Sequence, residues 1–442
     1  MGLFSQFIKN IKDRYLFTKN DRLLLAVSGG LDSVVLTALC RKAGFDFGIA
    51  HCNFQLRDAA SDADELFVKN LSEQFDAPFF RIRFNTKDYA LENKLSIQEA
   101  ARELRYRWFE DIRKVEGFDY ILTAHHANDN IETVLMNFFR GTGITGLTGI
   151  KEKNGALVRP LLFAKRKELE DYLSEENLSF VQDESNLKND YTRNFIRNAL
   201  FPQMAAIYPE VENNLAANID RFKAADHLYR EAIDRYKKKL AVQKGAELHI
   251  PILLLQKSVA PSTILFELIK VYGFSSGQLP EVERLMGSEP GHYVSSETHR
   301  VIRDRKHLVL APLRGAEKTR VLIDGEGQYH FDGGHISILA AAYQGGKIPQ
   351  EPNRAWLDAK EINFPMILRP WKTGDYFYPL GMEKKKKLSR FLIDTKRSLT
   401  EKENTWVVEM NKKIIWVVGQ RIDNRFRITD QTKNIIEISC NE

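Results

Sequence analysis

The chain has 442 residues, of which 43% are hydrophobic and 28% charged, as is typical of a globular protein with more than one core. Its 65 Lys and Arg against 59 Asp and Glu leave a net charge of +6, too small by itself to indicate a nucleic-acid partner. Three cysteines without a Cys-x-x-Cys pair disfavour a disulfide framework and a zinc or iron–sulfur site, and no apolar run is long enough for a membrane span. The first residues also lack a signal peptide and a myristoylation motif, so we expect a cytoplasmic protein without a membrane partner.

Strand and helix patterns alternate through the first part of the chain. The runs that favour buried strands are residues 22–27, 45–50, 78–84 and 120–122. The segments with helical spacing are residues 31–42, 59–75 and a third that follows the capping box at 96–99. This alternation predicts an α/β fold with a doubly wound, mostly parallel sheet, in which ligands bind beyond the carboxyl ends of the strands.

The pattern changes after about residue 209. Long helical segments are predicted at residues 215–240 and 266–285. After Pro312 the strand candidates are residues 320–323, 336–339, 414–418 and 435–438. We therefore predict three domains: residues 1–208 with the parallel sheet, a helical domain at 209–312, and a small α+β domain at 313–442.

A glycine-containing loop joins the first predicted strand to the first helix. It consists of Ser28, Gly29, Gly30, Leu31, Asp32 and Ser33. Two glycines let the backbone approach a ligand closely, and a helix N-terminus directs free N–H groups at an anion. The serines add hydroxyl donors, and Asp32 is suited to hold Mg²⁺ against phosphate oxygens. Because no lysine follows as in a Walker loop, the pattern predicts a different phosphate-binding loop.

Charged residues at helical spacing form further candidate sites. Arg102 and Arg105 share a face of the capped helix and fit a phosphate clamp, although a solvated basic face is the simpler interpretation. If a helix begins at His125, then His125, Asp129 and Glu132 project from one side. That set also resembles a transition-metal site, which the cysteines do not support. Arg193 and Arg197, four residues apart, would stack on one helix face.

A run of basic residues lies near the C-terminus. It comprises Lys384, Lys385, Lys386, Lys387 and Arg390. The aromatic residues that precede it are Trp371, Tyr376, Phe377 and Tyr378. Basic groups beside aromatic rings suit phosphates and stacked nucleotides, whereas the alternative is a solvated charge run over a packed aromatic cluster.

The glycine loop resembles the pyrophosphate-binding loop of the N-type ATP pyrophosphatases, the PP-loop superfamily. Several further motifs, in their order along the chain, resemble the tRNA(Ile)-lysidine synthase family over nearly the whole sequence. They are residues 51–57, 101–106, 123–133, 140–147, 159–162, 183–186, 191–198, 369–375, 379–382, 386–389, 391–394 and 416–423. Phe54 departs from the pattern, since many members carry histidine there, and so do residues 58–60, where glycine and glutamate are usual.

The resemblance implies a fold, a reaction and a set of roles. ATP would adenylate the wobble cytidine of an isoleucine tRNA with a CAU anticodon, and the side-chain amine of free L-lysine would displace AMP to give lysidine, AMP and pyrophosphate. Residues 28–33 would cradle pyrophosphate, with Mg²⁺ at Asp32, and His51, Arg102, His125 and Arg193 would contact ATP or the adenylate. Asp129 would hold the lysine amine, and residues 313–442 would bind tRNA. Arg105, Glu132 and Arg197 complete the expected substrate contacts.

Two other functions fit part of the same pattern. A PP-loop tRNA thiolase shares the adenylation step but needs a sulfur carrier, for which only Cys52 lies near the site. A non-catalytic RNA-binding protein on the same fold would not need Ser28, Asp32 and Asp129 together. Family members of this length also lead us to expect a homodimer.

Overall fold

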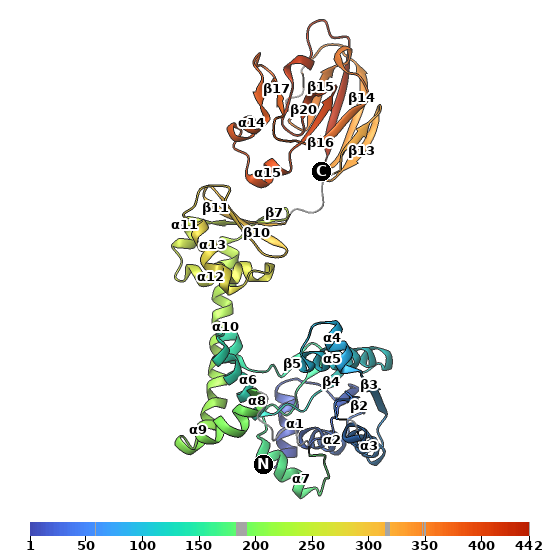
Figure 1. Cartoon of the computed structure of the whole chain (residues 1–442), viewed down its shortest axis with the longest axis vertical. Helices are drawn as coiled ribbons and strands as arrows, with labels where there is room; N and C mark the ends of the chain where they lie inside the picture. Colours follow the sequence, from blue (N-terminus) through green and yellow to red (C-terminus); the bar gives the residue numbers. More distant parts are fainter. Residues whose placement is uncertain (58, 183–191, 314–318, 347, 349–350, 442) are drawn as a thin grey trace. The chain divides into compact units, whose positions relative to one another are not determined.

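The computed structural model describes residues 1–57, 59–182, 192–313, 319–346, 348 and 351–441. The chain divides into two compact units, residues 1–231 and 232–442, and the boundary lies within the long helix α10 (Val211–Leu240). Figure 1 labels the elements of both units. Within the described residues, no helix is long and apolar enough to cross a membrane.

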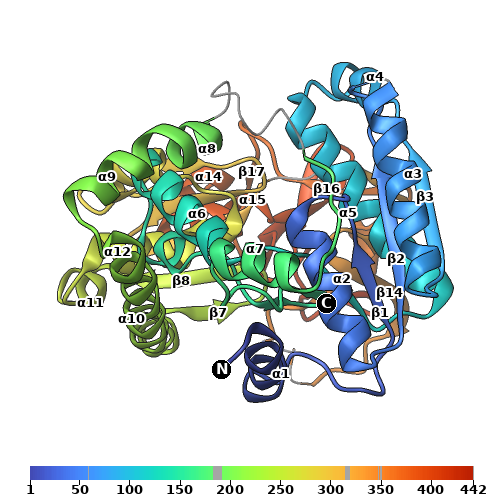
Figure 2. The same ribbon diagram turned by 90° about the horizontal axis from the view of Figure 1, so that it is seen from below.

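A six-stranded sheet forms the centre of the first unit. Its order is β3-β2-β1-β4-β6-β5, and every neighbouring pair is parallel except β6 with β5. Figure 2 shows β3, β2 and β1 following one another in this order. The strands are β1 (Leu23–Ala26), β2 (Phe47–Asn53), β3 (Phe79–Arg83), β4 (Tyr120–Leu122), β5 (Lys153–Asn154) and β6 (Leu157–Val158). The predicted parallel sheet is therefore confirmed.

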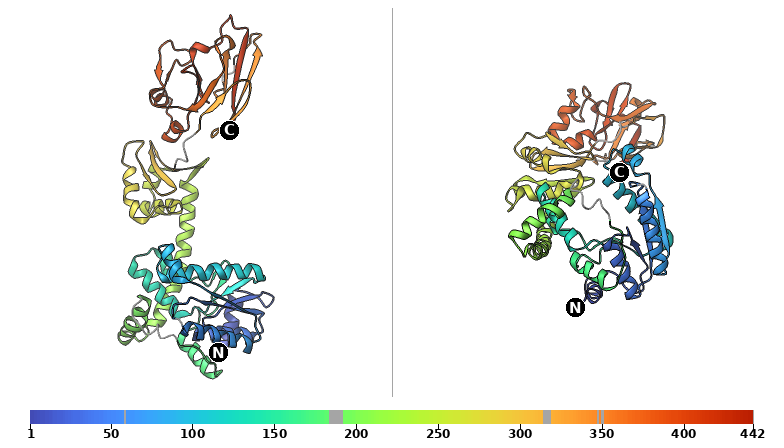
Figure 3. Two further views of the ribbon diagram at one scale, coloured as in Figure 1. Left: turned by 45° about the vertical axis from the view of Figure 1, so that its right-hand side comes forward. Right: turned by 60° about the horizontal axis from the view of Figure 1, so that its bottom comes forward.

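Helices cover both faces of this sheet. Successive strand residues point to opposite sides, and the apolar residues of β1 therefore need a helix on each side. Leu23 and Leu25 pack into one core with α2, while Leu24 packs into a second core with Phe109 and Ile112 of α5. Figure 3 (left) shows the strands between the dark-blue α2 and the cyan α5. The other helices of the unit are α1 (Leu3–Asp13), α3 (Ala59–Gln74), α4 (Thr86–Glu92), α6 (Ala127–Arg140), α7 (Arg166–Glu175), α8 (Thr192–Phe195) and α9 (Phe201–Ile207); α2 is Leu31–Ala43 and α5 is Ile97–Glu116. The sheet is thus doubly wound.

Two local features of the first unit position its polar residues. The predicted capping box is present, with Ser96 and Glu99 closing the N-terminus of α5 reciprocally. A π-helical turn (Ile196–Leu200) joins α8 to α9 and contains Arg197. Such turns rotate side chains relative to a regular helix and occur frequently at functional sites.

The second unit begins with a sheet that hydrophobic spacing did not predict. Five antiparallel strands in the order β7-β8-β11-β10-β9 accompany the short helices of residues 252–285. The helical segment predicted at 266–285 is found as two helices, α12 and α13. They are separated near Gly273, which adopts a φ of +83°. The elements are β7 (Val242–Lys244), β8 (Glu247–Pro251), α11 (Ile252–Gln256), α12 (Pro261–Ile269), α13 (Leu279–Leu285), β9 (Tyr293–Ser295), β10 (His299–Asp304) and β11 (His307–Pro312).

The remaining residues form antiparallel sheets, and two of these sheets share the larger of two hydrophobic cores. A four-stranded sheet, β13-β14-β22-β15, and a five-stranded sheet, β12-β16-β19-β20-β21, both contribute to it, and Trp416 is completely buried there. A two-stranded ribbon, β17 with β18, carries Lys386 and Lys387. The elements are β12 (Val321–Ile323), β13 (Gly327–Phe331), β14 (Gly334–Ala342), β15 (Arg354–Asp358), β16 (Met366–Pro370), β17 (Tyr376–Phe377), β18 (Lys386–Lys387), α14 (Leu388–Asp394), α15 (Leu399–Glu403), β19 (Trp406–Met410), β20 (Lys413–Val417), β21 (Arg421–Ile422) and β22 (Asn434–Asn441).

Candidate active site

The loop after β1 has the backbone of a phosphate-binding turn. Gly29 adopts a φ of +87°, and a Cβ atom there would lie 3.3 Å from Phe67 and 3.4 Å from Val68 and Val181. The N-terminus of α2 has no side-chain cap, so its N–H groups remain available to an anion. The Ser33 hydroxyl donates to the Gly30 carbonyl at 2.8 Å and thereby fixes the turn.

A cavity of about 920 Å³ opens at this loop and at the carboxyl ends of the neighbouring strands. It brings together most of the site residues predicted from the sequence. The predicted residues that line it are Ser28, Gly30, Leu31, Asp32, Ser33, Arg105, His125, Asp129, Arg193 and Arg197. A volume of this size accommodates a nucleotide together with a second small ligand.

Asp32 lies at the floor of this cavity. Its Oδ1 atom is buried and has no hydrogen-bond partner among the described residues, and Oδ2 lies 3.8 Å from Nη1 of Arg166. Burial raises the pKa of Asp32 above its ordinary value, although His126 and Arg166 act in the opposite direction. An unpartnered carboxylate oxygen beside a phosphate-binding loop fits the oxygen ligands that Mg²⁺ prefers.

The N-terminus of α6 differs from the sequence expectation in its starting residue. The helix begins at Ala127 with His126 as its N-cap, so His125 precedes the helix instead of sharing a face with Asp129 and Glu132. Nδ1 of His126 accepts the Asn128 N–H at 3.2 Å, and the Asp129 carboxylate accepts the His126 N–H at 3.1 Å. This reciprocal cap directs Asp129 toward the cavity.

His125 still reaches the cavity from its place before the helix. Its Nδ1 lies 3.0 Å from the hydroxyl of Thr123, at the end of β4. Burial, with the nearby guanidinium groups acting in the same direction, lowers the pKa of His125 to about 4. The imidazole is therefore neutral near pH 7 and can exchange hydrogen bonds without adding charge.

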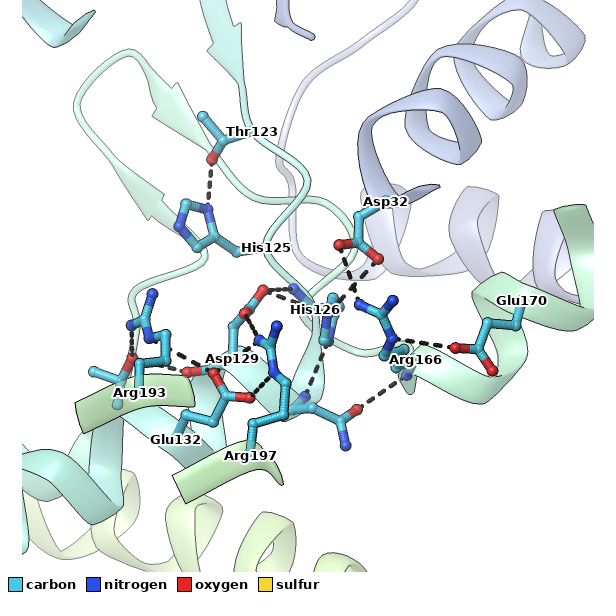
Figure 4. A network of polar contacts seen from close by, with 12 residues as sticks. Asp32, Thr123, His125, His126, Asp129, Glu132, Arg166, Glu170, Arg193 and Arg197 are labelled. Carbon is cyan, nitrogen blue, oxygen red and sulfur yellow. Dashed lines mark hydrogen bonds and ion pairs between the residues drawn. The ribbon is translucent and has the colours of Figure 1, made fainter. Parts of the chain in front are cut away.

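Acidic and basic side chains interlock beside Asp129, as Figure 4 shows. Arg197 donates to Glu132 at 2.6 Å and to Asp129 at 3.1 Å, and Arg193 lies 3.6 Å from Glu132. Burial raises the pKa of Glu132, although Arg197 lies against this residue. At Asp129, the neighbouring histidines and Arg197 outweigh burial and hold the pKa below its ordinary value. The short contact with Arg197 pairs Glu132 as a carboxylate, so both acids carry charge in this network.

Some predicted site residues lie away from the cavity wall. His51 is buried within β2, where its Nδ1 bonds the Val27 carbonyl at 2.9 Å. Arg102 is exposed, with its guanidinium 5.0 Å from the ring of Tyr106, whereas the guanidinium of Arg105 lies 5.0 Å from the ring of Phe54. The two arginines therefore contact different aromatic rings.

Other motif residues fall outside the described part of the chain or have no site contact. Residues 183–186, Tyr191 and Asp58 lie outside the described residues. Gly29 and Glu132 support the cavity without lining it. Among the described residues, no group of three or more His, Cys, Asp or Glu has the arrangement of a metal cluster.

The sequence analysis did not name as site residues the two residues that approach Asp32 in Figure 4. His126 lies 3.7 Å from Asp32 and 3.6 Å from Asp129, and Arg166 approaches Asp32 from the N-terminus of α7. His126 follows the predicted residue His125, and its position as the N-cap of α6 is the signal that could have identified it. Arg166 belongs to no motif, and only the fold brings it to the loop.

The basic run of the second unit lies on a segment called here the basic hairpin, residues 376–390, in which β17 pairs with β18 and α14 then begins. Lys384, Lys385 and Lys387 are exposed, while Lys386 bonds Asp394 at 2.9 Å and Arg390 bonds the same carboxylate at 3.1 Å. Of the nearby aromatic residues, Phe377 is fully buried, and Tyr376 is exposed beside Lys385. The aromatic cluster is therefore partly core and partly surface.

Three family models and several known proteins match most of the chain. A PP-loop domain model matches residues 3–204, a TilS substrate binding domain residues 243–313, and a TilS substrate C-terminal domain residues 366–440. The tRNA(Ile)-lysidine synthases of Bacteroides thetaiotaomicron and Parabacteroides distasonis are 40% and 39% identical to it, each over 97% of both chains. That of Porphyromonas gingivalis strain W83 is 34% identical over 97% of this chain and 96% of its own. These matches carry the family name that the motifs predicted.

Proposed function

The chain belongs to the tRNA(Ile)-lysidine synthase family, and from that membership we propose its full reaction: adenylation of the wobble cytidine of a CAU-anticodon isoleucine tRNA, followed by attack of L-lysine. It is an ATP-using ligase that acts on tRNA. The observation that carries the finer proposal is the cavity in which the PP-loop and Asp32 face the Asp129–Glu132–Arg197 network. One wall suits phosphates and the other suits a primary amine.

The two half-reactions need different groups. In the first, the cytidine carbonyl oxygen attacks the α-phosphorus of ATP, and pyrophosphate leaves. The loop of residues 28–33 would hold that pyrophosphate through backbone N–H groups and the serine hydroxyls. Asp32 would hold Mg²⁺, which supplies charge neutralisation for the phosphates. Arg193 and neutral His125 would contact the adenylate, and Arg102 and His51 remain candidates for the same role.

In the second half-reaction, the lysine side-chain nitrogen attacks the ring carbon, and AMP leaves with the former carbonyl oxygen. A lysine ammonium has a pKa of about 10.4 and would lose its proton to solvent water before it attacks. Because the pKa of Asp129 is held low, this carboxylate is a weak base, so we propose that it orients the amine. Glu132 and Arg197 would fix its position, and Arg105 would contact the RNA beside Phe54.

Substrate RNA would also contact the second unit. The exposed Lys384, Lys385 and Lys387 of the basic hairpin present ammonium groups to phosphates, and Lys386 and Arg390 would contribute through their shared carboxylate. We further propose that the domains divide near residues 208 and 312. We also propose that the protein is cytoplasmic and forms a homodimer. The middle residues would help to bind substrate.

The thiolase alternative is less well supported by the cysteines. Cys52 lines the cavity, but burial raises its pKa to about 12, so its nucleophilic thiolate is scarce at neutral pH. Cys40 is fully buried in α2. A non-catalytic RNA-binding protein would have no need for a buried, unpartnered Asp32 oxygen beside a phosphate loop.

One assay tests the whole proposal. Purified protein is mixed with ATP, Mg²⁺, radiolabelled L-lysine and unmodified CAU-anticodon isoleucine tRNA, and RNA-bound label and AMP are followed together. We expect one lysine incorporated for each AMP released. AMP release without lysine incorporation would contradict lysine as the nucleophile, and label transfer without ATP would contradict adenylation.

A further inference from the structure

We infer that His126 is a positioning residue that holds Asp32 and Asp129 in a fixed mutual orientation through one Nε2–H group. The two carboxylates belong to the phosphate side and the amine side of the cavity, so the inference rests on the function proposed above. The imidazole is 1% exposed and lies between β4 and α6, where Figure 4 shows it between the two acids.

The helix cap determines which ring nitrogen carries hydrogen. Nδ1 of His126 accepts the backbone N–H of Asn128 at 3.2 Å, so Nδ1 carries no hydrogen of its own. A histidine ring that accepts a hydrogen bond at Nδ1 carries its proton on Nε2. The backbone contact at Nδ1 therefore directs the Nε2–H donor into the space between Asp32 and Asp129. This contact does not depend on a bound substrate.

The surroundings of Nε2 show that this donor is not used elsewhere. It lies 3.7 Å from Oδ1 of Asp32 and 3.6 Å from Oδ2 of Asp129, just beyond hydrogen-bonding distance. Both Nε2 and the Asp32 Oδ1 are buried without a hydrogen-bond partner among the described residues. Unpaired buried polar atoms are rare in folded proteins, and a shift of less than about 1 Å would pair these two.

His126 also holds Asp129 through its backbone N–H group. The His126 N–H donates to that carboxylate at 3.1 Å, so one residue contacts Asp129 twice and Asp32 once. Without the Nε2–H, the two carboxylates would face each other across the cavity with no donor between them. Among side chains, Arg166 and Arg197 would then orient the two acids, while the His126 backbone N–H would still hold Asp129.

A role as helix cap alone is the competing explanation, and two substitutions separate the roles. In His126→Asn, the side-chain oxygen takes the place of Nδ1 and caps well, but no atom reaches the position of Nε2. In His126→Gln, the amide N–H reaches that position, but glutamine is a poor cap. Positioning and capping therefore predict opposite orders for the two variants.

The experiment compares the full-length wild type with both variants by thermal unfolding and by calorimetric titration with MgATP and with L-lysine. We expect His126→Asn to unfold near the wild-type temperature but to bind each ligand roughly tenfold more weakly. We expect His126→Gln to unfold at a lower temperature yet to bind each ligand within about threefold of wild type. Wild-type binding by His126→Asn, or equally weak binding by both variants, would overturn the inference.

The two titrations also separate this inference from the proposed function. A wild-type chain that binds MgATP but neither binds nor transfers lysine would overturn the proposed function. The MgATP titration of the two variants would still test the contact between His126 and Asp32.

Discussion

The polar network of the cavity and the basic hairpin place charge in opposite environments. In the cavity, the side chains of Glu132 and Asp129 are 5% and 15% exposed, and each has a fixed partner. In the hairpin, Arg390 is 69% exposed and Lys384 and Lys387 are exposed. Buried charges interact strongly with one specific neighbour, whereas exposed charges are screened by salt and act as a group. Single substitutions should therefore be severe in the cavity and graded in the hairpin.

The largest effect is expected from Asp32→Ala. Removing the partly buried carboxylate beside the phosphate loop should lower both AMP release and lysine incorporation by about a hundredfold to a thousandfold. The assay with labelled lysine measures both products. Asp46→Ala is the control, because the Asp46 side chain is 65% exposed and its ion pair with Arg22 lies on the surface. Activity of the Asp32 variant above a tenth of wild type would contradict the role assigned to this residue.

Arg197→Met tests how strongly the cavity depends on its internal pairs. Glu132 would be left buried without its closest guanidinium, which should lower the free energy of unfolding by about 3 kcal/mol. The Glu132→Gln/Arg197→Met double variant should recover most of that loss in urea unfolding. Arg193→Met should cost less than about 1 kcal/mol, because Arg193 is 41% exposed and lies 3.6 Å from Glu132. Equal losses for both arginines would show that the network is not specific.

Glu65 extends the comparison to pH. Burial alone would raise its pKa, but hydrogen bonds from Arg83, Asn53 and Arg81 outweigh burial and lower it from 4.5 to about 2. A depressed carboxyl pKa gives stability that is complete above pH 4.5 and is lost as the pH falls toward 2. Glu65→Gln should therefore be less stable by about 2 to 3 kcal/mol at neutral pH, with a difference that shrinks in that window.

Urea unfolding at several pH values measures the effect of Glu65. The matched control is Glu73→Gln, because the Glu73 side chain is 66% exposed and its pair with Lys69 is on the helix surface. The control should change the free energy of unfolding little at any pH. A Glu65 variant with the same deficit at pH 2 and pH 7 would contradict the assigned pKa.

The smallest effect for each residue is expected in the hairpin. Replacing Lys384, Lys385 and Lys387 together with serine should reduce the slope of log affinity for tRNA against log salt by about 2. Lys386→Ser should change it less, because Lys386 already bonds Asp394. Filter binding at several salt concentrations measures the slope, and a triple substitution of the exposed Lys9, Lys12 and Lys19 is the charge-matched control. An unchanged slope would contradict the proposed RNA contact.

Much of the first unit follows from local sequence. Residues 120–122 form a strand as predicted, and the helix after the PP-loop begins at Leu31, because apolar runs, glycines and capping residues act over short distances. The loop that they position was predicted for the same reason. The loop lies at the carboxyl ends of the strands, where residues that are about 100 positions apart in the sequence come together.

What the sequence did not predict depends on distant partners. The five-stranded sheet of residues 242–312 includes strands of three to six residues, such as Tyr293–Ser295, whose pairing no periodicity reveals. Arg166 reaches Asp32 only because α7 packs beside the loop. His126 was overlooked because the helix was assumed to begin at His125, whereas it begins at Ala127 with His126 as its N-cap.

Gly29 has a consequence for how the gene tolerates mutation. Every single-base change in a glycine codon that replaces the glycine with another amino acid introduces a Cβ atom. At a φ of +87°, with Phe67, Val68 and Val181 within 3.4 Å of where that atom would be placed, each such change strains the backbone and crowds the wall of the turn. A complete set of substitutions under selection for function should therefore leave this codon among the least variable, even though the glycine touches no ligand through a side chain.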